Sequence, residues 1–130
     1  MIDKQQGHAE IPTESFEGLG LKEDLLKGIY SYGFVKPSSV QCQVIPSILK
    51  GKDTIILAQS GTGRTFACTI SVLQLVDPEI RECQALIIYS TYSMARTIHF
   101  PTSCLGNFLN VIISGSHDLQ KGAQVVVGSA

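Results

Sequence analysis

Between residues 54 and 76 the chain passes from an apolar run, through a glycine-rich turn, into a helical pattern. The run Thr54-Ile55-Ile56-Leu57-Ala58 predicts a strand buried on both faces of a sheet. Two glycines follow within residues 59–63, and residues 64–76 then carry apolar side chains at helical spacing. A strand that leads through such a turn into a helix is typical of α/β folds.

Further helices are indicated on both sides of this region by apolar spacing and by capping residues. Their expected bounds are residues 21–32 with the stop Gly33, the stretch from the Ser38-Ser39 cap to Gly51, and a start near Thr91 and Ser93. Pro46 is expected to kink or shorten the second of these helices, and Pro101 to end the third early.

Three more apolar runs predict strands. They are Ala85 to Tyr89, expected to be buried, and the runs 111–113 and 125–127. Because apolar strands alternate with helices, the crossovers are of the β-α-β kind. The predicted fold class is therefore α/β, with a mainly parallel sheet flanked by helices.

The turn before the helix at residue 64 is a candidate phosphate-binding loop. Its sequence, Ala58-Gln59-Ser60-Gly61-Thr62-Gly63-Arg64-Thr65, lets backbone N–H groups converge on an anion at a helix N-terminus. The Thr65 hydroxyl is placed to complete the shell of a magnesium ion on the outer phosphates. The pattern G-x-x-x-x-G-K-[ST] is met only in part, because Ala58 replaces its first glycine and Arg64 its lysine. A glycine-rich turn without a ligand is the alternative.

Composition limits the classes of protein that fit. Ten basic and eleven acidic residues give a net charge of −1, which argues against a domain that holds nucleic acid by bulk charge. No apolar run is long enough to span a bilayer, so we expect a soluble intracellular chain without membrane contact. Residues 1–14 are polar and without period, which predicts a flexible tail. Three of the four cysteines, Cys42, Cys68 and Cys104, have apolar or small neighbours and are expected to behave as small core residues.

Two segments together resemble known motifs. Phe16 and the stretch Gly33-Phe34-Val35-Lys36-Pro37-Ser38-Ser39-Val40-Gln41 resemble the Q motif of DEAD-box RNA helicases, and AQSGTGRT resembles their motif I. The likeness is greatest to the translation initiation factor 4A group and covers about the first two-thirds of the chain. It implies that residues 15–130 form a truncated N-terminal RecA-like P-loop domain, with ATP and Mg²⁺ as cofactors.

The resemblance also implies roles for individual residues. Phe34 is similar to the aromatic residue that stacks on adenine, and Gln41 to the amide that reads the adenine edge. Phe16 is similar to the upstream aromatic residue that supports the Q motif. On the sequence pattern alone, Phe34 and Gln41 would be a core aromatic and a solvated amide. The phosphate-binding positions, by the same resemblance, are Ser60, Gly61, Thr62, Gly63, Arg64 and Thr65.

The likeness weakens after Tyr89. Residues 90–95, Ser-Thr-Tyr-Ser-Met-Ala, replace the RNA-contacting motif P-T-R-E-L-A, with Tyr92 at its arginine and Ser93 at its glutamate. RNA binding is therefore expected to be weak and sensitive to salt. No D-E-x-D sequence occurs in the 130 residues, so no catalytic residue is assigned and ATP hydrolysis by this chain alone is not expected.

These features leave two hypotheses of function. The first is an ATP-binding part of an ATP-dependent RNA helicase, cytoplasmic or nuclear, with RNA and components of the translation initiation or exon-junction machinery as partners. The second is a non-catalytic nucleotide-binding or protein-interaction module derived from such a helicase. A copy that lacks a stable fold, with an exposed apolar sheet edge, is a third possibility.

Overall fold

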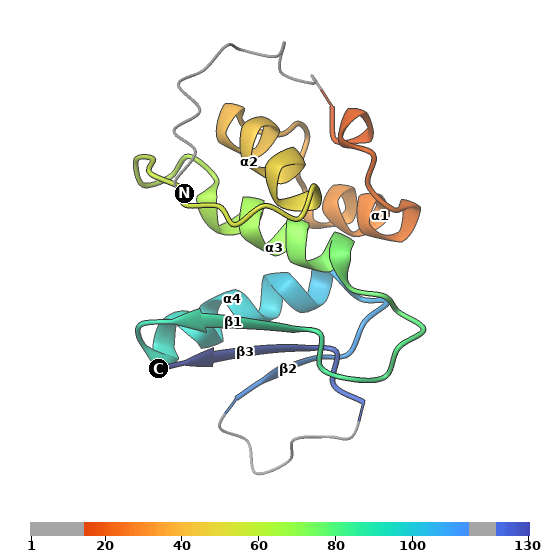
Figure 1. Ribbon diagram of the computed structural model, residues 1–130, viewed down its shortest axis with the longest axis vertical. Helices are drawn as coiled ribbons and strands as arrows, with labels where there is room; N and C mark the ends of the chain where they lie inside the picture. The colour runs from red at the N-terminus through yellow and green to blue at the C-terminus, as the bar shows by residue number, and fades with distance from the viewer. Residues whose placement is uncertain (1–14, 115–121) are drawn as a thin grey trace.

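The computed structural model describes residues 15–114 and 122–130, so the predicted tail 1–14 lies outside the described residues. Helices lie together on one side of a small sheet (Figure 1). The elements in chain order are η1 (Glu17–Leu19), α1 (Glu23–Tyr32), α2 (Ser39–Leu49), α3 (Arg64–Leu75), β1 (Ala85–Tyr89), α4 (Tyr92–Leu105), β2 (Val111–Ile113) and β3 (Val125–Ser129).

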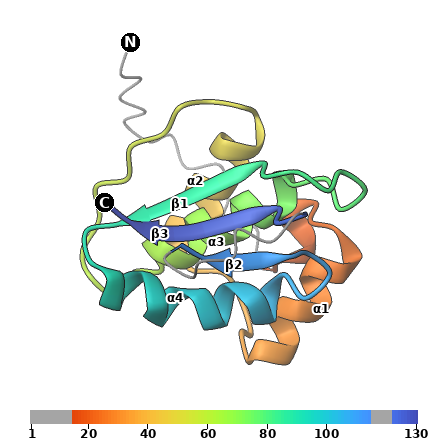
Figure 2. The same cartoon turned by 90° about the horizontal axis from the view of Figure 1, so that it is seen from below.

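The sheet is parallel throughout its described part and has the strand order β1-β3-β2. Val125 is in register with Ala85 on one side and with Val111 on the other. The three predicted strands and their parallel arrangement are therefore confirmed. Figure 2 shows the sheet in front of the helices, and no described helix crosses the face that is turned toward the viewer.

The core lies between the helices and the covered face of the sheet. Its fully buried side chains come from the N-terminal segment, from all four α-helices and from β3. They include Phe16, Leu25, Ile29, Ile45, Ile70, Leu73, Leu105, Val125 and Val127. Helix α1 packs so closely on the end of α4 that a Cβ on Gly28 would lie 2.2 Å from the Leu105 carbonyl oxygen. Only glycine fits this contact without a shift of backbone.

Local capping signals explain where the helices begin and end. Gly33, at a φ of 111°, ends α1, and its N–H donates to carbonyls of that helix. Ser38 and Gln41 form a capping box at the start of α2. The Thr91 hydroxyl accepts from the Met94 N–H, 3.2 Å away, at the start of α4. The predicted stop at Gly33 and the predicted starts near residues 38 and 91 are confirmed.

The strand predicted over Thr54 to Ala58 is wrong. This segment belongs to no helix or strand, and its Ile55 and Leu57 side chains are 70% and 92% exposed. A strand requires a hydrogen-bonding neighbour, and this segment pairs with none of the three described strands. The expectation of a buried strand at residues 85–89 is half right, because β1 forms but leaves Leu86 and Ile88 exposed on the uncovered face.

The expectation that Pro101 ends its helix early is wrong. Helix α2 runs through Pro46 to Leu49, and α4 runs through Pro101 to Leu105. Pro101 is itself buried, and the helix beyond it contributes the buried Leu105 to the core. Packing therefore offsets the loss of one backbone hydrogen bond. The core assignment of Cys68 is also wrong, since that side chain is exposed.

Candidate nucleotide-binding site

Hydrogen bonds join the segment before α2 to the glycine-rich loop before α3. The Ser38 hydroxyl donates to the Thr62 carbonyl oxygen at 2.8 Å, and the Gln41 Nε2 donates to the Gly63 carbonyl oxygen at 3.3 Å. The Gln41 Oε1 in turn accepts from the Ser38 N–H at 2.9 Å. The structure thus brings together two segments that are about twenty residues apart and were both singled out in the sequence.

Gln41 is not the solvated amide that its sequence pattern favours. Its side chain is only 3% exposed, and each end of the amide already has a partner inside the protein. One N–H of Nε2 and one lone pair of Oε1 remain beyond these two bonds. The first role of Gln41 in this structure is to fix the loop against α2.

Two glycines shape the loop. Gly61 and Gly63 have φ values of 81° and 89°, a region that L-residues with side chains rarely adopt. A Cβ at Gly63 would lie 2.6 Å from the Gln41 Nε2 and 2.9 Å from the Ser38 Oγ, whereas a Cβ at Gly61 would meet nothing within 4 Å. Gly63 is therefore needed for contact with α2, and Gly61 only for the path of the backbone.

The first turn of α3 presents backbone N–H groups that have no acceptor inside the helix. The first N–H that bonds back to the loop is that of Ala67, which donates to the Gly63 carbonyl oxygen at 2.9 Å. The preceding N–H groups of the first turn have no acceptor inside the helix, and the helix dipole adds partial positive charge there. Ser60 and Gly61 are exposed beside this turn. The arrangement suits an anion such as a phosphate group.

Arg64 and Thr65 begin the helix. The Arg64 side chain is exposed and forms no ion pair with any described carboxylate, so its charge is open to a ligand. Thr65 is half-buried in the first turn, where a hydroxyl is near any group held by the loop. The Thr62 hydroxyl is engaged with the Gln59 carbonyl oxygen at 2.7 Å and stabilises the loop itself.

An aromatic cluster adjoins the loop. Phe34 is half-buried, with the Tyr32 ring stacked at 5.7 Å and the Phe66 ring edge-on at 4.8 Å between centroids. Phe16 is fully buried 6.2 Å from Phe34, so it supports that ring and is not open to a ligand. The sequence analysis did not predict that Tyr32 and Phe66 belong to this cluster. Phe66 could have been proposed, because it directly follows Thr65 of the candidate phosphate-binding loop.

A hydrogen bond between Tyr30 and Glu17 stabilises the segment that contains Phe16. The Tyr30 hydroxyl donates to the Glu17 carboxylate at 2.6 Å, next to an edge-on contact of Tyr30 with Phe16. This bond lowers the pKa of Glu17 and raises the pKa of Tyr30. Glu17 therefore helps to hold Phe16 behind Phe34.

Residues 90–95, which follow β1, are distant in sequence from this loop. They include the start of α4. Thr91 uses its hydroxyl as the cap of α4, while Tyr92 and Met94 are about half exposed.

Among the described residues, no helix is long and apolar enough to cross a membrane.

Sequence comparison now identifies relatives of this fold and site. Residues 38–129 match the DEAD/DEAH box helicase family. The chain is 41% identical over 150 residues to the ATP-dependent RNA helicase eIF4A of Neosartorya fischeri, covering 99% of this chain and 38% of the relative. It is 44% identical over 127 residues to eIF4A of Botryotinia fuckeliana, covering 90% of this chain and 32% of the relative. The chain thus spans about a third of the length of these curated relatives.

Solved structures agree with the sequence matches. The L327V variant of S. cerevisiae Dbp5, bound to RNA and ADP BeF3, superposes with a TM-score of 0.81 at 35% identity, over 90% of this chain and 32% of that one. Prp28 of Chaetomium thermophilum, bound to ADP, gives a TM-score of 0.79 at 26% identity, over 95% of this chain and 34% of that one. The predicted RecA-like α/β fold is confirmed.

Proposed function

This chain belongs to the DEAD/DEAH box helicase family, and on that premise we propose that residues 15–130 bind ATP as part of an RNA helicase. The binding site consists of residues 34–41 and the loop 60–65. One observation carries the proposal. Ser38 and Gln41 hydrogen-bond to carbonyl groups of the loop, so residues 34–41, which would contact the base, are held against residues 60–65, which would contact the phosphates.

The loop binds the phosphates. The N–H groups of residues 64–66, which have no acceptor inside the helix, and the Arg64 guanidinium supply donors and positive charge at one helix end. The loop fits this role because Gly61 leaves open space where a side chain would stand. Thr65 is the residue that would help to hold Mg²⁺, an ion that neutralises charge on the outer phosphates when it is bound.

The aromatic cluster binds the base. The half-buried Phe34 is held by Phe16, Tyr32 and Phe66, so its ring is fixed before a ligand arrives and little side-chain freedom is lost on stacking. The remaining N–H and lone pair of Gln41 match one acceptor and one donor on the adenine edge.

Arg64 favours binding of phosphate by the loop over hydrolysis of ATP. Arginine keeps the charge of the usual lysine, but its planar fork has a different reach and geometry. The sequence also contains no D-E-x-D carboxylates to hold magnesium and orient water. We therefore propose that these 130 residues bind ATP without hydrolysing it at a measurable rate.

RNA unwinding is proposed only for a longer helicase of which this domain is a part. Dbp5, a solved relative, binds RNA together with ADP BeF3. In this chain the arginine position of the RNA motif is the half-exposed Tyr92, so RNA contact relies on backbone groups and is weak.

The alternative, a non-catalytic interaction module, draws support from a separate observation. Leu86 and Ile88 are 61% and 59% exposed on the open side of β1. Exposed apolar side chains that lie close together are typical of surfaces that associate. Candidate partners are proteins of the translation initiation or exon-junction machinery.

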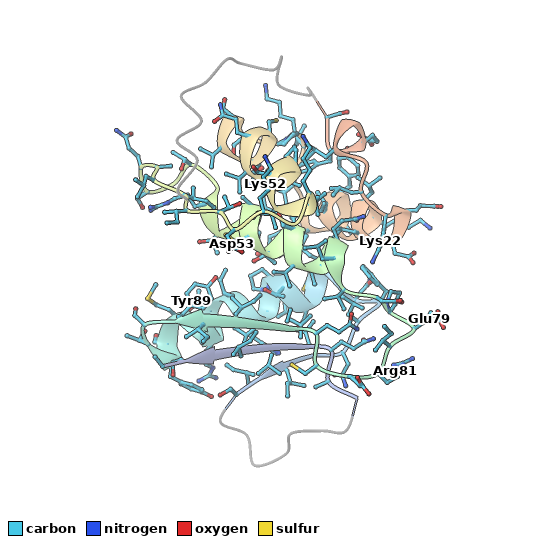
Figure 3. The ribbon with its side chains drawn as sticks, in the orientation of Figure 1. Lys22, Lys52, Asp53, Glu79, Arg81 and Tyr89 are labelled. Carbon is cyan, nitrogen blue, oxygen red and sulfur yellow. The ribbon has the colours of Figure 1, made fainter. Side chains whose placement is uncertain are left out.

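A titration with a fluorescent ATP analogue tests the binding proposal. We expect Arg64→Ala to weaken binding about 10- to 100-fold, the usual contribution of a charge-assisted hydrogen bond to phosphate. Arg64→Lys should retain the affinity of the parent chain or exceed it. Arg81→Ala is the matched control, because Arg81 is also exposed but lies beyond the other end of α3 (Figure 3). Equal affinities of the Arg64→Ala variant and the parent chain would refute the role of the loop.

A further inference from the structure

Phe66 is the ring of the aromatic cluster that belongs to α3. It is the third residue of that helix and directly follows Thr65. Its ring centroid lies 4.8 Å from that of Phe34 and 6.0 Å from that of Tyr32. The contact with Phe34 is the shortest ring contact in the described part of the chain. The first turn of α3 is therefore joined directly to the ring on which the base would stack.

Tyr32, Phe34 and Phe66 form an aromatic triad in which each ring contacts the other two. Tyr32 stacks on Phe34 at an interplanar angle of 28°, whereas Phe66 is inclined to Phe34 by 70°. Two rings inclined so steeply form the walls of a corner and not one flat stack. In such a corner, a planar base that stacks on Phe34 directs one edge at Phe66. The positive C–H groups of that edge are attracted to the negative face of an aromatic ring.

The aromatic triad is partly open to solvent. Phe34 and Phe66 are each half-buried, and Tyr32 is 41% exposed. Phe16, by contrast, is fully buried beside Phe34 and can only support it. All contacts of the triad join residues within 32–66, so they are internal to the domain. Phe66 therefore holds Phe34 in place and still leaves part of its own ring open to a ligand.

Phe66 also lies next to the phosphate-binding side of the site. Arg64, Thr65 and Phe66 belong to the first turn of α3, where the backbone N–H groups have no acceptor inside the helix. Successive side chains of a helix point about 100° apart around its axis, so the side chains of Thr65 and Phe66 lie on neighbouring faces. A ligand that extends from the Phe34 ring to these N–H groups therefore passes the Phe66 ring.

The chemistry of the phenylalanine ring limits what Phe66 can recognise. The ring has no hydrogen-bond donor or acceptor, so it cannot read the hydrogen-bonding pattern of a base. It can respond to the size of a base, because the attraction between apolar surfaces grows with the area in contact. A purine has two fused rings and a pyrimidine has one. A purine stacked on Phe34 therefore has ring surface left to contact Phe66.

We propose that Phe66 contacts the base and makes the site selective for purine over pyrimidine nucleotides. The proposal rests on the proposed function, because it requires a nucleotide that lies between the aromatic triad and the loop 60–65. The base stacks on Phe34, and Phe66 contacts its edge from the first turn of α3. Discrimination between adenine and guanine remains with the amide of Gln41. Size and hydrogen-bonding pattern are thus read by different side chains.

Phe66→Trp gives a direct readout of contact, because the chain contains no tryptophan of its own. We expect ATP to quench the emission of the introduced indole in a saturable way. Tripolyphosphate, which can occupy the loop but has no base, should leave the emission unchanged. Phe100→Trp is the matched control, since Phe100 is 68% exposed on α4 and lies outside the site. If ATP binds Phe66→Trp as tightly as the parent chain but does not alter its emission, the proposed contact is overturned.

Calorimetric titration of Phe66→Leu with ATP and CTP tests selectivity. Adenine and cytosine both present an amino donor beside a ring-nitrogen acceptor to an amide such as that of Gln41, so the two nucleotides differ mainly in ring size. We expect the parent chain to bind ATP at least tenfold more tightly than CTP, in line with the usual contribution of one base–aromatic contact. Phe66→Leu should lose about tenfold in affinity for ATP and less than about twofold for CTP.

Two sets of outcomes separate this proposal from the proposed function. Equal affinities of the parent chain for ATP and CTP, or an unchanged ratio in Phe66→Leu, would overturn the role of Phe66 and leave ATP binding itself in place. A parent chain that binds ATP no more tightly than tripolyphosphate would instead refute the base site, and with it the role of Phe66. Circular dichroism of each variant confirms that the fold is retained.

Discussion

Replacing Gly63 by alanine inserts a methyl group where the loop meets α2. The added Cβ would lie 2.6 Å from the Gln41 Nε2 and 2.9 Å from the Ser38 Oγ, and the residue would keep a φ of 89°. The left-handed conformation costs about 1–2 kcal/mol for a residue with a side chain. Displacing the Gln41 and Ser38 bonds to the loop carbonyls costs about 1 kcal/mol each, and more for the buried amide. We expect a total destabilisation of about 3–5 kcal/mol.

Gly61→Ala is the matched control. Gly61 has nearly the same φ, 81°, but an added Cβ there meets open space. This variant carries only the backbone strain of about 1–2 kcal/mol. Thermal unfolding followed by far-UV circular dichroism measures both, with about 3–5 °C expected for each kcal/mol in a chain of this size. Equal shifts for the two variants would refute the claim that the loop is held by Ser38 and Gln41.

Three further changes test other parts of the structure. Gly28→Ala should lower the free energy of unfolding in urea by about 3 kcal/mol or more, because the new Cβ would meet the Leu105 carbonyl oxygen of α4 at 2.2 Å. An unchanged urea midpoint would contradict the close packing of α1 on α4. Tyr30→Phe removes the hydroxyl that lowers the pKa of Glu17. The stabilisation from that bond is present above the unfolded pKa of about 4.5 and is lost as the pH falls through the lower folded value, so the variant should show a flatter melting-temperature profile as the pH falls below about 4.5. Although the Cys68 side chain is exposed, the groups packed around its thiol partly desolvate it and raise its pKa, so iodoacetamide at about pH 8 should alkylate Cys68 more slowly than free glutathione, as peptide mass spectrometry would show.

Local signals made the helices predictable. The capping box of Ser38 and Gln41, the stop at Gly33 and the cap at Thr91 depend on residues within one turn, so the sequence alone contains them. The three strands also followed from their apolar runs, and the parallel arrangement from their alternation with helices.

The features that were predicted wrongly depend on contacts with residues that are distant in the sequence. Residues 54–58 have strand propensity, but a strand forms only beside another, and this segment lies against none of the three described strands in hydrogen-bonding register. An apolar run also does not reveal whether one or both faces are covered, which is why the exposure of Leu86 and Ile88 was missed. Pro101 stays within α4 because the packing of the helix outweighs the local preference.

The candidate site was predictable in part. The glycine spacing identified the loop, and the family resemblance identified Phe34 and Gln41 as its companions. The bonds that join Gln41 to the Gly63 carbonyl, and the packing of Phe66 on Phe34, depend on how α2 lies against α3. Such contacts between elements carry no local sequence signal.

Isothermal titration of the purified chain with ATP and with GTP tests the central claim most directly. We expect ATP to bind with a dissociation constant between micromolar and millimolar, or about −8 to −4 kcal/mol, and GTP to bind at least tenfold more weakly. Phe34→Ala should remove most of this preference, since it deletes the ring that the cluster holds in place. A folded chain that binds neither nucleotide, or binds both equally, would contradict the assignment of this site to adenine nucleotides.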